Sequence, residues 1–320
     1  MEMRRLGRSG LKVSPVWLGG NPFGWTIDEK QSMAVLDAYV GAGGNAIDTA
    51  DSYSLWKTGN VGGESEAIIG NWHTSRRSRH AVVIATKVFT RMGNLPHEAG
   101  LSRRWIMEAV ENSLRRLQTD YIDLYQAHSD DPETPLEESL RAFDDLVSHG
   151  KVRYIGCSNY SAWRLTQALW VSDRRGYVRY ESVQPRYNLV DREGYETDLE
   201  PMIRAHEIGV VCYYGLASGF LTGKYQQGQP LPPSMRAGGV QQSYFNDRGW
   251  RTLAAVENVA RRVNATPSQV ALAWVIQRPG MTAPIASATT ADQARELLGA
   301  ANVALDAAAT QELDVASAWK

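Results

Sequence analysis

Cysteine is scarce in this sequence, since Cys157 and Cys212 are the only two among 320 residues. Two cysteines so far apart make neither a disulfide framework nor a metal-ligand motif, and we expect each to fill a small slot in the core. A net excess of charge is also lacking, because 34 basic residues face 35 acidic ones. This balance provides no basic field for nucleic acid or an anionic membrane surface, so we expect neither as a partner.

Long apolar runs are absent too. No stretch approaches the roughly 18 apolar residues that a membrane-spanning helix needs. The first residues, Met1 to Gly7, lack the apolar centre of a signal peptide. We therefore expect a cytoplasmic protein. No Pro/Ser-rich linker interrupts the chain, and the length suits one α/β barrel, so residues 1–320 are predicted to form a single domain.

What the sequence does contain is an alternation of short apolar runs with longer amphipathic stretches. This rhythm is typical of β/α units and a parallel sheet. Eight strands are predicted at 16–19, 46–49, 81–88, 121–128, 152–158, 181–185, 210–214 and 282–286. No G-x-G-x-x-G follows any of them, which disfavours an open nucleotide-binding sheet. We therefore expect an α/β fold of the (β/α)8 TIM-barrel type.

Helices are expected between and after these strands, with a few irregular segments. The predicted helices cover 28–42, 64–72, 102–118, 135–148, 162–171, 199–207, 253–263, 268–277, 292–300 and 306–316. Residues 4–14 have the pattern of a β-hairpin, with Arg8-Ser9-Gly10 as its turn, that plugs the bottom of the barrel. Residues 225–249 are expected to form a long irregular loop, which in a compact domain is usually functional or mobile.

Reactive side chains fall at the ends of three neighbouring predicted strands. Asp48 and Tyr53 end or follow the second strand, Lys87 ends the third, and His128 ends the fourth. The carboxyl ends of barrel strands meet at one mouth, so the four should lie together there. Each residue alone has an ordinary structural explanation, but a lysine inside an apolar strand must pair or shift its pKa.

Together the four residues suit protonation of a developing alkoxide. We expect the Lys87 ammonium to lower the pKa of the Tyr53 phenol and the Asp48 carboxylate to hold Lys87. A neutral His128 imidazole can hydrogen-bond the substrate oxygen and fix its approach. No side chain is a hydride source, so a cofactor must supply the hydride.

Five motifs in order resemble those of the aldo-keto reductase family, from about residue 4 to residue 301. They are Asp48-Thr49-Ala50-Asp51-Ser52-Tyr53, Thr86-Lys87, Gln126-Ala127-His128, Gly156-Cys157-Ser158-Asn159 and Gln184-Pro185-Arg186-Tyr187-Asn188. A sixth segment, 213–225, is similar to a form also seen in potassium-channel β subunits. The resemblance implies a nicotinamide-dependent carbonyl reductase with Tyr53 as general acid, tuned by Lys87 and Asp48, and His128 orienting the carbonyl.

The resemblance also implies a cofactor site. The carboxamide would be held by Ser158, Asn159 and Gln184, and Tyr213 would stack on the nicotinamide. The remaining residues that the resemblance implies for the cofactor are Gly20, Asn21, Pro22, Asp48, Tyr214, Gly215, Leu216, Ser218, Gly219, Lys224, Arg236, Ser287, Thr289, Gln293 and Glu296. Lys224 and Arg236 favour NADPH, with NADH as the alternative.

Several positions depart from the family pattern. Tyr214-Gly215 replaces a common Ser-Pro, Ser287 replaces a glycine, Thr289 stands where many members have serine or a basic residue, and Leu297 replaces an asparagine. The last three lie in the segment expected to hold the adenosine end of the cofactor.

Two functions other than reduction of small carbonyl compounds are alternatives for this sequence. A nucleotide-binding regulatory or redox-sensing subunit would keep the cofactor but act through a protein partner. An unrelated barrel lyase or isomerase would need metal or substrate-phosphate ligands that the sequence does not offer. Aromatic residues after strand ends, Phe23, Trp25, Trp56 and Phe89, are candidates for the wall of a substrate pocket. Neither the particular substrate nor an oligomeric state follows from the sequence.

Overall fold

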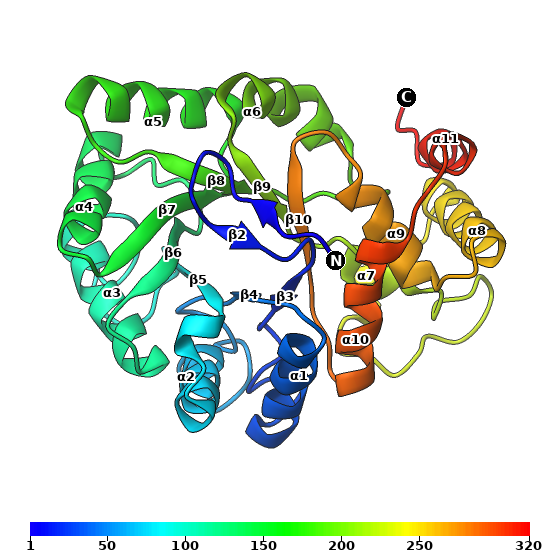
Figure 1. Cartoon of the computed structure of the whole chain (residues 1–320), viewed down its shortest axis with the longest axis horizontal. Coiled ribbons are helices and arrows are strands. Elements are labelled where there is room, and N and C mark those ends of the chain that lie inside the picture. Colours follow the sequence, from blue (N-terminus) through cyan, green and yellow to red (C-terminus); the bar gives the residue numbers. More distant parts are fainter.

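Eight parallel strands close into a barrel in the computed structural model, which describes all residues from 1 to 320 (Figure 1). Around the barrel the strands follow the order β10-β3-β4-β5-β6-β7-β8-β9, so chain order is kept and β10 closes on β3. The strands are β3 (Trp17–Gly19), β4 (Ala46–Asp48), β5 (Val83–Val88), β6 (Ile122–Ala127), β7 (Val152–Ser158), β8 (Tyr180–Gln184), β9 (Gly209–Cys212) and β10 (Met281–Ala286). The predicted (β/α)8 barrel is confirmed.

Helices surround the barrel, as Figure 1 shows. They are α1 (Glu29–Gly41), α2 (Glu64–Arg76), α3 (Arg103–Leu117), α4 (Leu136–Ser148), α5 (Ala162–Arg175), α6 (Glu200–His206), α7 (Ala237–Tyr244), α8 (Asp247–Arg262), α9 (Pro267–Ile276), α10 (Ala291–Gly299) and α11 (Ala307–Ala316). Asp28 and Thr266 begin α1 and α9 with reciprocal capping boxes, which satisfy otherwise free backbone amides. None of these helices combines the length and apolarity that crossing a membrane requires.

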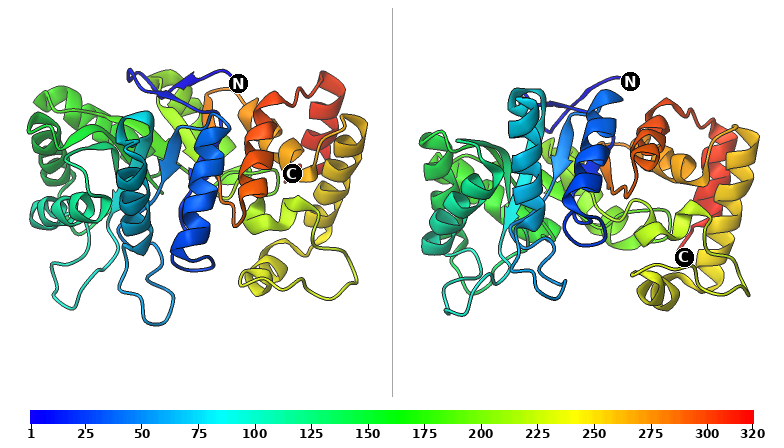
Figure 2. Two further views of the ribbon diagram at one scale, coloured as in Figure 1. Left: turned by 60° about the horizontal axis from the view of Figure 1, so that its bottom comes forward. Right: turned by 90° about the horizontal axis from the view of Figure 1, so that it is seen from below.

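The predicted hairpin forms from β1 (Arg4–Arg5) and β2 (Lys12–Val13), which pair antiparallel. Its Leu6 and Val13 belong to the same apolar cluster as residues that point into the barrel, including Trp17 and Leu124. Figure 2 shows the hairpin at one end of the barrel and the long loops that follow the strands at the other. The hairpin thus closes the end at which the strands begin and leaves the other end open.

Most predicted boundaries lie within two residues of the observed ones. The strand predicted at 81–88 begins only at Val83, because the chain before it forms a single 3₁₀ turn, Arg79–Ala81. The helices α2 and α5 run four residues further than predicted, to Arg76 and Arg175. The last four residues of each helix are polar, so the apolar periodicity predicted C-terminal ends that came too early.

The prediction of an irregular segment at 225–249 is wrong in part, because α7 lies inside it and α8 begins at Asp247. Two adjacent glycines, Gly238 and Gly239, make α7 a poor helix by local propensity. Tertiary packing compensates: Tyr244 is buried and its ring stacks on Phe220, with centroids 5.6 Å apart. The helix therefore depends on contacts that a local pattern does not reveal.

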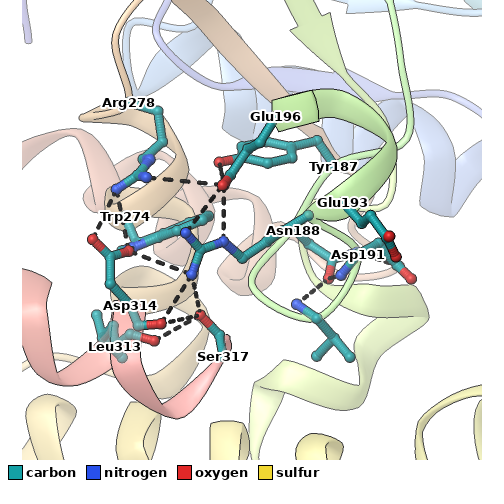
Figure 3. Close-up of polar contacts among 12 residues, drawn as sticks. Tyr187, Asn188, Asp191, Glu193, Glu196, Trp274, Arg278, Leu313, Asp314 and Ser317 are labelled. Carbon is teal, nitrogen blue, oxygen red and sulfur yellow. Dashed lines mark hydrogen bonds and ion pairs between the residues drawn. The ribbon is translucent and has the colours of Figure 1, made fainter. Parts of the chain in front are cut away.

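The last helix, α11, is attached to the barrel by a buried ionic network. Arg192 donates to both carboxylate oxygens of Glu196, at 2.8 and 3.1 Å, and to the backbone oxygen of Asp314 and the hydroxyl of Ser317. Figure 3 shows Asp314 of α11, and Ser317 directly after that helix, beside Glu196 and Arg278. This network fixes the segment between β8 and α6, which begins at the open end of the barrel.

Candidate active site

Lys87 lies at the centre of the open end of the barrel. Its side chain is fully buried, and its ammonium donates to Asp48 Oδ2 at 2.7 Å, to the Thr49 backbone oxygen at 2.7 Å and to the Tyr53 hydroxyl at 3.0 Å. An ammonium has three hydrogens, so each has an acceptor. Asp48 ends β4, and Tyr53 lies in the turn that follows it. The structure thus brings together three of the four residues that the sequence predicted to meet, Asp48, Tyr53 and Lys87.

Asp48 connects this group to the opposite side of the barrel. Its Oδ2 also accepts from the Tyr53 hydroxyl at 3.2 Å, while its Oδ1 accepts from the side-chain amide of Gln184 at 2.8 Å. Gln184 is the last residue of β8 and is buried. One carboxylate therefore orients a phenol, an ammonium and an amide at once.

The expected lowering of the Tyr53 pKa is wrong in sign. Burial of the hydroxyl, followed by the negative charge of Asp48, raises the pKa of Tyr53 well above its usual value despite the nearby Lys87. Burial also lowers the pKa of Lys87, against the pull of Asp48 in the other direction. The structure therefore keeps the phenol protonated at neutral pH, which is the form that can donate a proton.

His128 follows β6 and faces the same mouth. Its ring centroid is 6.1 Å from that of Tyr53, and its Nδ1 is buried without a hydrogen-bond partner. Burial, and to a lesser extent the charge of Lys87, lowers the pKa of His128 to about 3. The imidazole is consequently neutral across the physiological range, as the sequence analysis expected.

A second hydrogen-bonded group lies beside these residues, at the ends of β7, β8 and β9. The Ser158 hydroxyl donates to the Gln184 backbone oxygen at 2.8 Å. Asn159 donates from its side-chain amide to the His128 backbone oxygen at 2.9 Å and accepts from the Tyr213 hydroxyl at 2.9 Å. Asn159 has φ 58°, a left-handed conformation that asparagine tolerates better than most residues. The predicted carboxamide-holding residues and the predicted stacking ring thus share one network.

A cavity of about 1080 Å³ opens above both groups, at the upper end of the range for ligand sites. Predicted site residues that line it are Asn21, Pro22, Asp48, Tyr53, His128, Ser158, Asn159, Gln184, Tyr213, Tyr214, Gly215, Leu216, Ser218, Gly219, Lys224, Arg236, Ser287, Thr289, Gln293 and Glu296. Lys87 lies behind Tyr53 and does not reach the cavity surface. Gly20 is also absent from the lining, because it packs against Ser65 and the Asp48 backbone, and Gly19 lines the cavity in its place.

The turn after β9 has an unusual backbone. Tyr214, Ala217 and Ser218 all have positive φ, as does Gly219. Neither Gly215 nor Leu216 uses its backbone N–H in a hydrogen bond within the chain. Free amides in a turn with left-handed residues are typical of anion-binding sites.

Two cations face this turn without a carboxylate partner. Lys224 lies so close to Gly219 that an added Cβ there would come within 3.2 Å of its Nζ. Burial and the positive charge of Arg236 lower the pKa of Lys224, and burial lowers that of Arg236. Two unneutralised cations beside free amides indicate a site for an anion.

The segment after β10 forms the far end of the cavity. The Ser287 hydroxyl donates to the Asn21 side-chain oxygen at 2.7 Å, which joins it to the loop after β3. Thr289 donates to Gln293 Oε1, and Glu296 accepts from the Thr266 hydroxyl at 2.7 Å. Leu297 lines the same end. This region is therefore polar on its loop side and apolar at Leu297.

Comparison with known proteins identifies the family of this chain. The sequence profile described as "Aldo/keto reductase family" matches residues 15–318. The chain belongs to the aldo/keto reductase family. The "Uncharacterized oxidoreductase YrpG" of Bacillus subtilis is 35% identical over 312 residues, covering 96% of this chain and 93% of the relative. As a member of the family, the protein is an NAD(P)H-dependent oxidoreductase.

Other relatives carry different names. A "Probable voltage-gated potassium channel subunit beta" of Oryza sativa subsp. japonica is 34% identical, covering 95% of this chain and 92% of the relative. The "Versiconal hemiacetal acetate reductase" of Aspergillus parasiticus is 33% identical, covering 98% of this chain and 96% of the relative. Enzymes of the aldo/keto reductase family reduce carbonyl compounds, while some relatives are named for a channel.

Of the four aromatic residues expected to line a substrate pocket, two lie at the cavity and two pack in or against the core. Phe23 is fully buried in the core, and Phe89 packs against the core from a partly buried position. Trp56 lines the cavity, and Trp25 packs edge-on against it, with ring centroids 5.5 Å apart. The backbone N–H of Phe23 donates to the Gly20 oxygen, so Phe23 lies in a tight turn directly after β3.

A buried acidic cluster behind Lys87 was not predicted. Glu66, on α2, accepts from the Thr86 hydroxyl and from Arg116 Nε at 2.7 Å. Asp51 is buried beside it, and burial, then the charge of Glu66, raises the pKa of Asp51 well above its usual value. The sequence signal for Glu66 is weak: it is an acidic residue close to the start of a helix and two residues before the buried pair Ile68-Ile69.

The Lys87–Asp48 ion pair makes a prediction about stability. Replacing Lys87 by methionine leaves a buried carboxylate without its cation, and we expect this to lower the free energy of unfolding by about 3–5 kcal/mol. Lys87→Met combined with Asp48→Asn should lose less than the sum of the single changes. The matched control is Arg76→Met at the exposed Arg76–Asp37 pair, where about 0–1 kcal/mol is expected. Urea unfolding measures all four variants, and equal losses for the two pairs would contradict the prediction.

Proposed function

We propose that the protein, as one domain over residues 1–320, catalyses the reversible NADPH-dependent reduction of an aldehyde or ketone to the alcohol. Tyr53 is the general acid in reduction and the general base in the reverse direction. The observation that carries this proposal is the Tyr53 hydroxyl, held 3.0 Å from the Lys87 ammonium and 3.2 Å from Asp48 at the floor of the cavity.

Tyr53 and Lys87 have complementary roles in this proposal. The raised pKa keeps the proton on Tyr53 until a substrate oxygen gains negative charge and takes it. The tyrosinate that remains lies next to a positive charge, which stabilises it as it forms. Asp48 holds Lys87 in position, since it is the only carboxylate that contacts the ammonium.

His128 orients the carbonyl. Its neutral ring lies across the cavity floor from Tyr53, and a neutral imidazole can offer one N–H to the carbonyl oxygen without competing for the proton. Two donors directed to one oxygen fix the carbonyl carbon relative to Tyr53.

The residues around the cavity fit a nicotinamide cofactor. Amide and hydroxyl groups of Ser158, Asn159 and Gln184 would hold the carboxamide, and the Tyr213 ring would support the nicotinamide face. The cofactor, when bound, supplies the hydride. Asn21 and Pro22, from the loop after β3, would contact it from the opposite side of the mouth.

The anion site after β9 would hold the cofactor phosphates. The amides of Gly215 and Leu216, with Lys224 and Arg236, supply both donors and positive charge. The segment with Thr289, Gln293 and Glu296 would hold the adenosine. We assign the backbone amides to the phosphates that both nucleotides carry and the two unneutralised cations to the additional phosphate of NADPH, which NADH lacks.

The regulatory alternative has one observation in its favour, the similarity to proteins named as channel β subunits. Against it, the residues proposed for proton donation are all present and joined by hydrogen bonds. Slow turnover over a broad panel of carbonyl compounds, with nucleotide retained through purification, would favour that alternative over an enzyme.

Replacing Tyr53 by phenylalanine tests the proposed proton donor. We expect the rate of carbonyl reduction to fall by about 10²–10⁴-fold, the usual contribution of a general acid, because the hydroxyl is removed and the ring kept. Fluorescence titration should show NADPH binding changed by less than about threefold, since the phenol holds a substrate and not a phosphate. Tyr154→Phe, at the closed end of the barrel, is the control. Full activity of Tyr53→Phe would remove Tyr53 from this role.

Replacing Lys224 and Arg236 by alanine tests the phosphate site. We expect the dissociation constant for NADPH to rise about tenfold or more and that for NADH to rise less, because charge-assisted bonds to the additional phosphate are lost. Both constants are measured by fluorescence titration. Lys12→Ala, which removes an exposed cation on the hairpin at the closed end of the barrel, should change neither. Equal weakening of both nucleotides would count against these residues as ligands of the additional phosphate.

A further inference from the structure

Exposed apolar side chains gather at the open end of the barrel. Of the twelve large hydrophobic side chains that are exposed, seven lie in loops that follow strand ends: Leu55, Trp56, Val61, Leu95, Tyr214, Leu231 and Met235. Figure 2 shows these long loops together on the side away from the hairpin. Four of the seven, Leu55, Trp56, Tyr214 and Met235, line the cavity. Exposed apolar side chains that gather around one cavity are typical of a place where an apolar group binds.

Trp56 is the largest member of this group and the one nearest the proposed proton donor. Its ring centroid is 6.0 Å from that of Tyr53, and 51% of its surface is exposed in the cavity wall. Trp25 packs against it at 5.5 Å with an interplanar angle of 85°. Two perpendicular indole rings form a corner, and Trp56 leaves apolar surface free beside Tyr53.

Hydrogen bonds hold the two loops of this corner together. Lys57 and Asn60, from the loop after β4, both donate to the backbone oxygen of Gly24, beside Trp25. The Ser54 hydroxyl donates to the Phe23 backbone oxygen at 2.6 Å. These bonds hold the loops in place before a ligand binds, so the entropic cost of ordering the loops on binding is small.

Arg236 completes the corner from the third side. Its guanidinium carbon lies 5.6 Å from the centroid of Trp25, at cation–π distance. Arg236, which the proposed function assigns to a cofactor phosphate, thus also packs on Trp25. Trp56, Leu55 and Met235 keep exposed apolar surface in the lining of the cavity.

Carboxylate and amide groups are lacking along this wall. The loops that carry Leu55, Trp56 and Met235 contribute no carboxylate to the lining, and its hydroxyls on this side are those of Thr26, Ser52, Thr90 and Ser234. A polyhydroxylated body stacked on Trp56 would replace only part of its hydrogen bonds to water. A flat apolar body would instead stack on the indole and remove apolar surface from water.

We infer that the carbonyl group of the substrate is attached to a flat apolar body, as in aryl aldehydes and aryl ketones, and that this body stacks on Trp56 while its far end passes between Leu55 and Met235. This inference rests on the proposed function, because it takes Tyr53 as the point where the carbonyl oxygen is held. It makes Trp56 a specificity-determining residue and not a catalytic one.

Steady-state kinetics with matched aldehydes tests the inference. The holoenzyme is assayed with NADPH and propanal, glyceraldehyde, benzaldehyde or 2-naphthaldehyde. We expect kcat/KM to rise from the first two compounds to the last two, by about tenfold or more. Trp56→Ala should lose about tenfold or more on 2-naphthaldehyde beyond any loss on propanal, mainly through KM, because a uniform binding contact is removed.

Two further variants separate stacking from a structural effect. Trp56→Phe keeps an aromatic face and should recover most of the loss on 2-naphthaldehyde. Trp163→Ala removes an indole that is more exposed, at 67% against 51%, but lies on α5, outside the cavity, and should leave the preference unchanged. Equal losses of Trp56→Ala on all four aldehydes would overturn the inference.

A binding measurement distinguishes failure of the inference from failure of the proposed function. Calorimetry of the enzyme–NADPH complex with 2-naphthalenemethanol or 1-propanol requires no turnover. We expect the aryl alcohol to bind about tenfold or more tightly, and Trp56→Ala to remove that difference. If all aldehydes are reduced alike in a Tyr53-dependent manner and both alcohols bind alike, the inference is wrong while the function holds. If the aryl alcohol binds at Trp56 but nothing is reduced, the binding surface stands and the reductase proposal fails.

Discussion

A fully buried ammonium, that of Lys87, is the constraint on which the rest of the site depends. Removing such a charge from water costs several kcal/mol, which only close opposite charge and saturated hydrogen bonding offset. Asp48, Thr49 and Tyr53 supply the three acceptors, so the end of β4 and the turn after it must lie where Lys87 of β5 can reach them. The position of the phenol follows from the need to bury this charge without leaving a hydrogen unpaired.

From this point a continuous set of hydrogen bonds crosses the mouth of the barrel. Asp48 joins Gln184 of β8, whose backbone oxygen accepts from Ser158 of β7, and Asn159 joins His128 to Tyr213. The proposed proton donor and the proposed support for the nicotinamide are therefore parts of one rigid unit held by neighbouring strands. Beyond this unit, the loops carry exposed apolar side chains such as Trp56. The carbonyl group of a substrate would therefore contact the hydrogen-bonded unit, and the rest of the substrate would contact the loops.

The sequence predicts most of the framework because strand periodicity and strand-end chemistry are local signals. The strand Val152–Ser158 was predicted with its observed bounds, and Lys87 was correctly identified as a lysine that must pair. What failed depends on distant contacts. The helix α7 contains two glycines and exists because Tyr244 packs on Phe220, and Phe23 points inward. The predicted sign of the Tyr53 pKa shift was wrong, because burial of the hydroxyl and its contact with Asp48 outweigh the ammonium. Both depend on the three-dimensional arrangement and leave no local signal in the sequence.

The central claim is that this buried unit keeps Tyr53 as a protonated phenol, ready to donate. Ultraviolet difference titration of the native protein against Tyr53→Phe, over a pH range that leaves both folded, isolates the ionisation of that one ring. The raised pKa predicts no tyrosinate from Tyr53 up to about pH 10, the ordinary value for a free tyrosine. A tyrosinate band that appears in the difference spectrum near neutral pH would mean that Lys87 prevails over burial and Asp48, and would contradict the account.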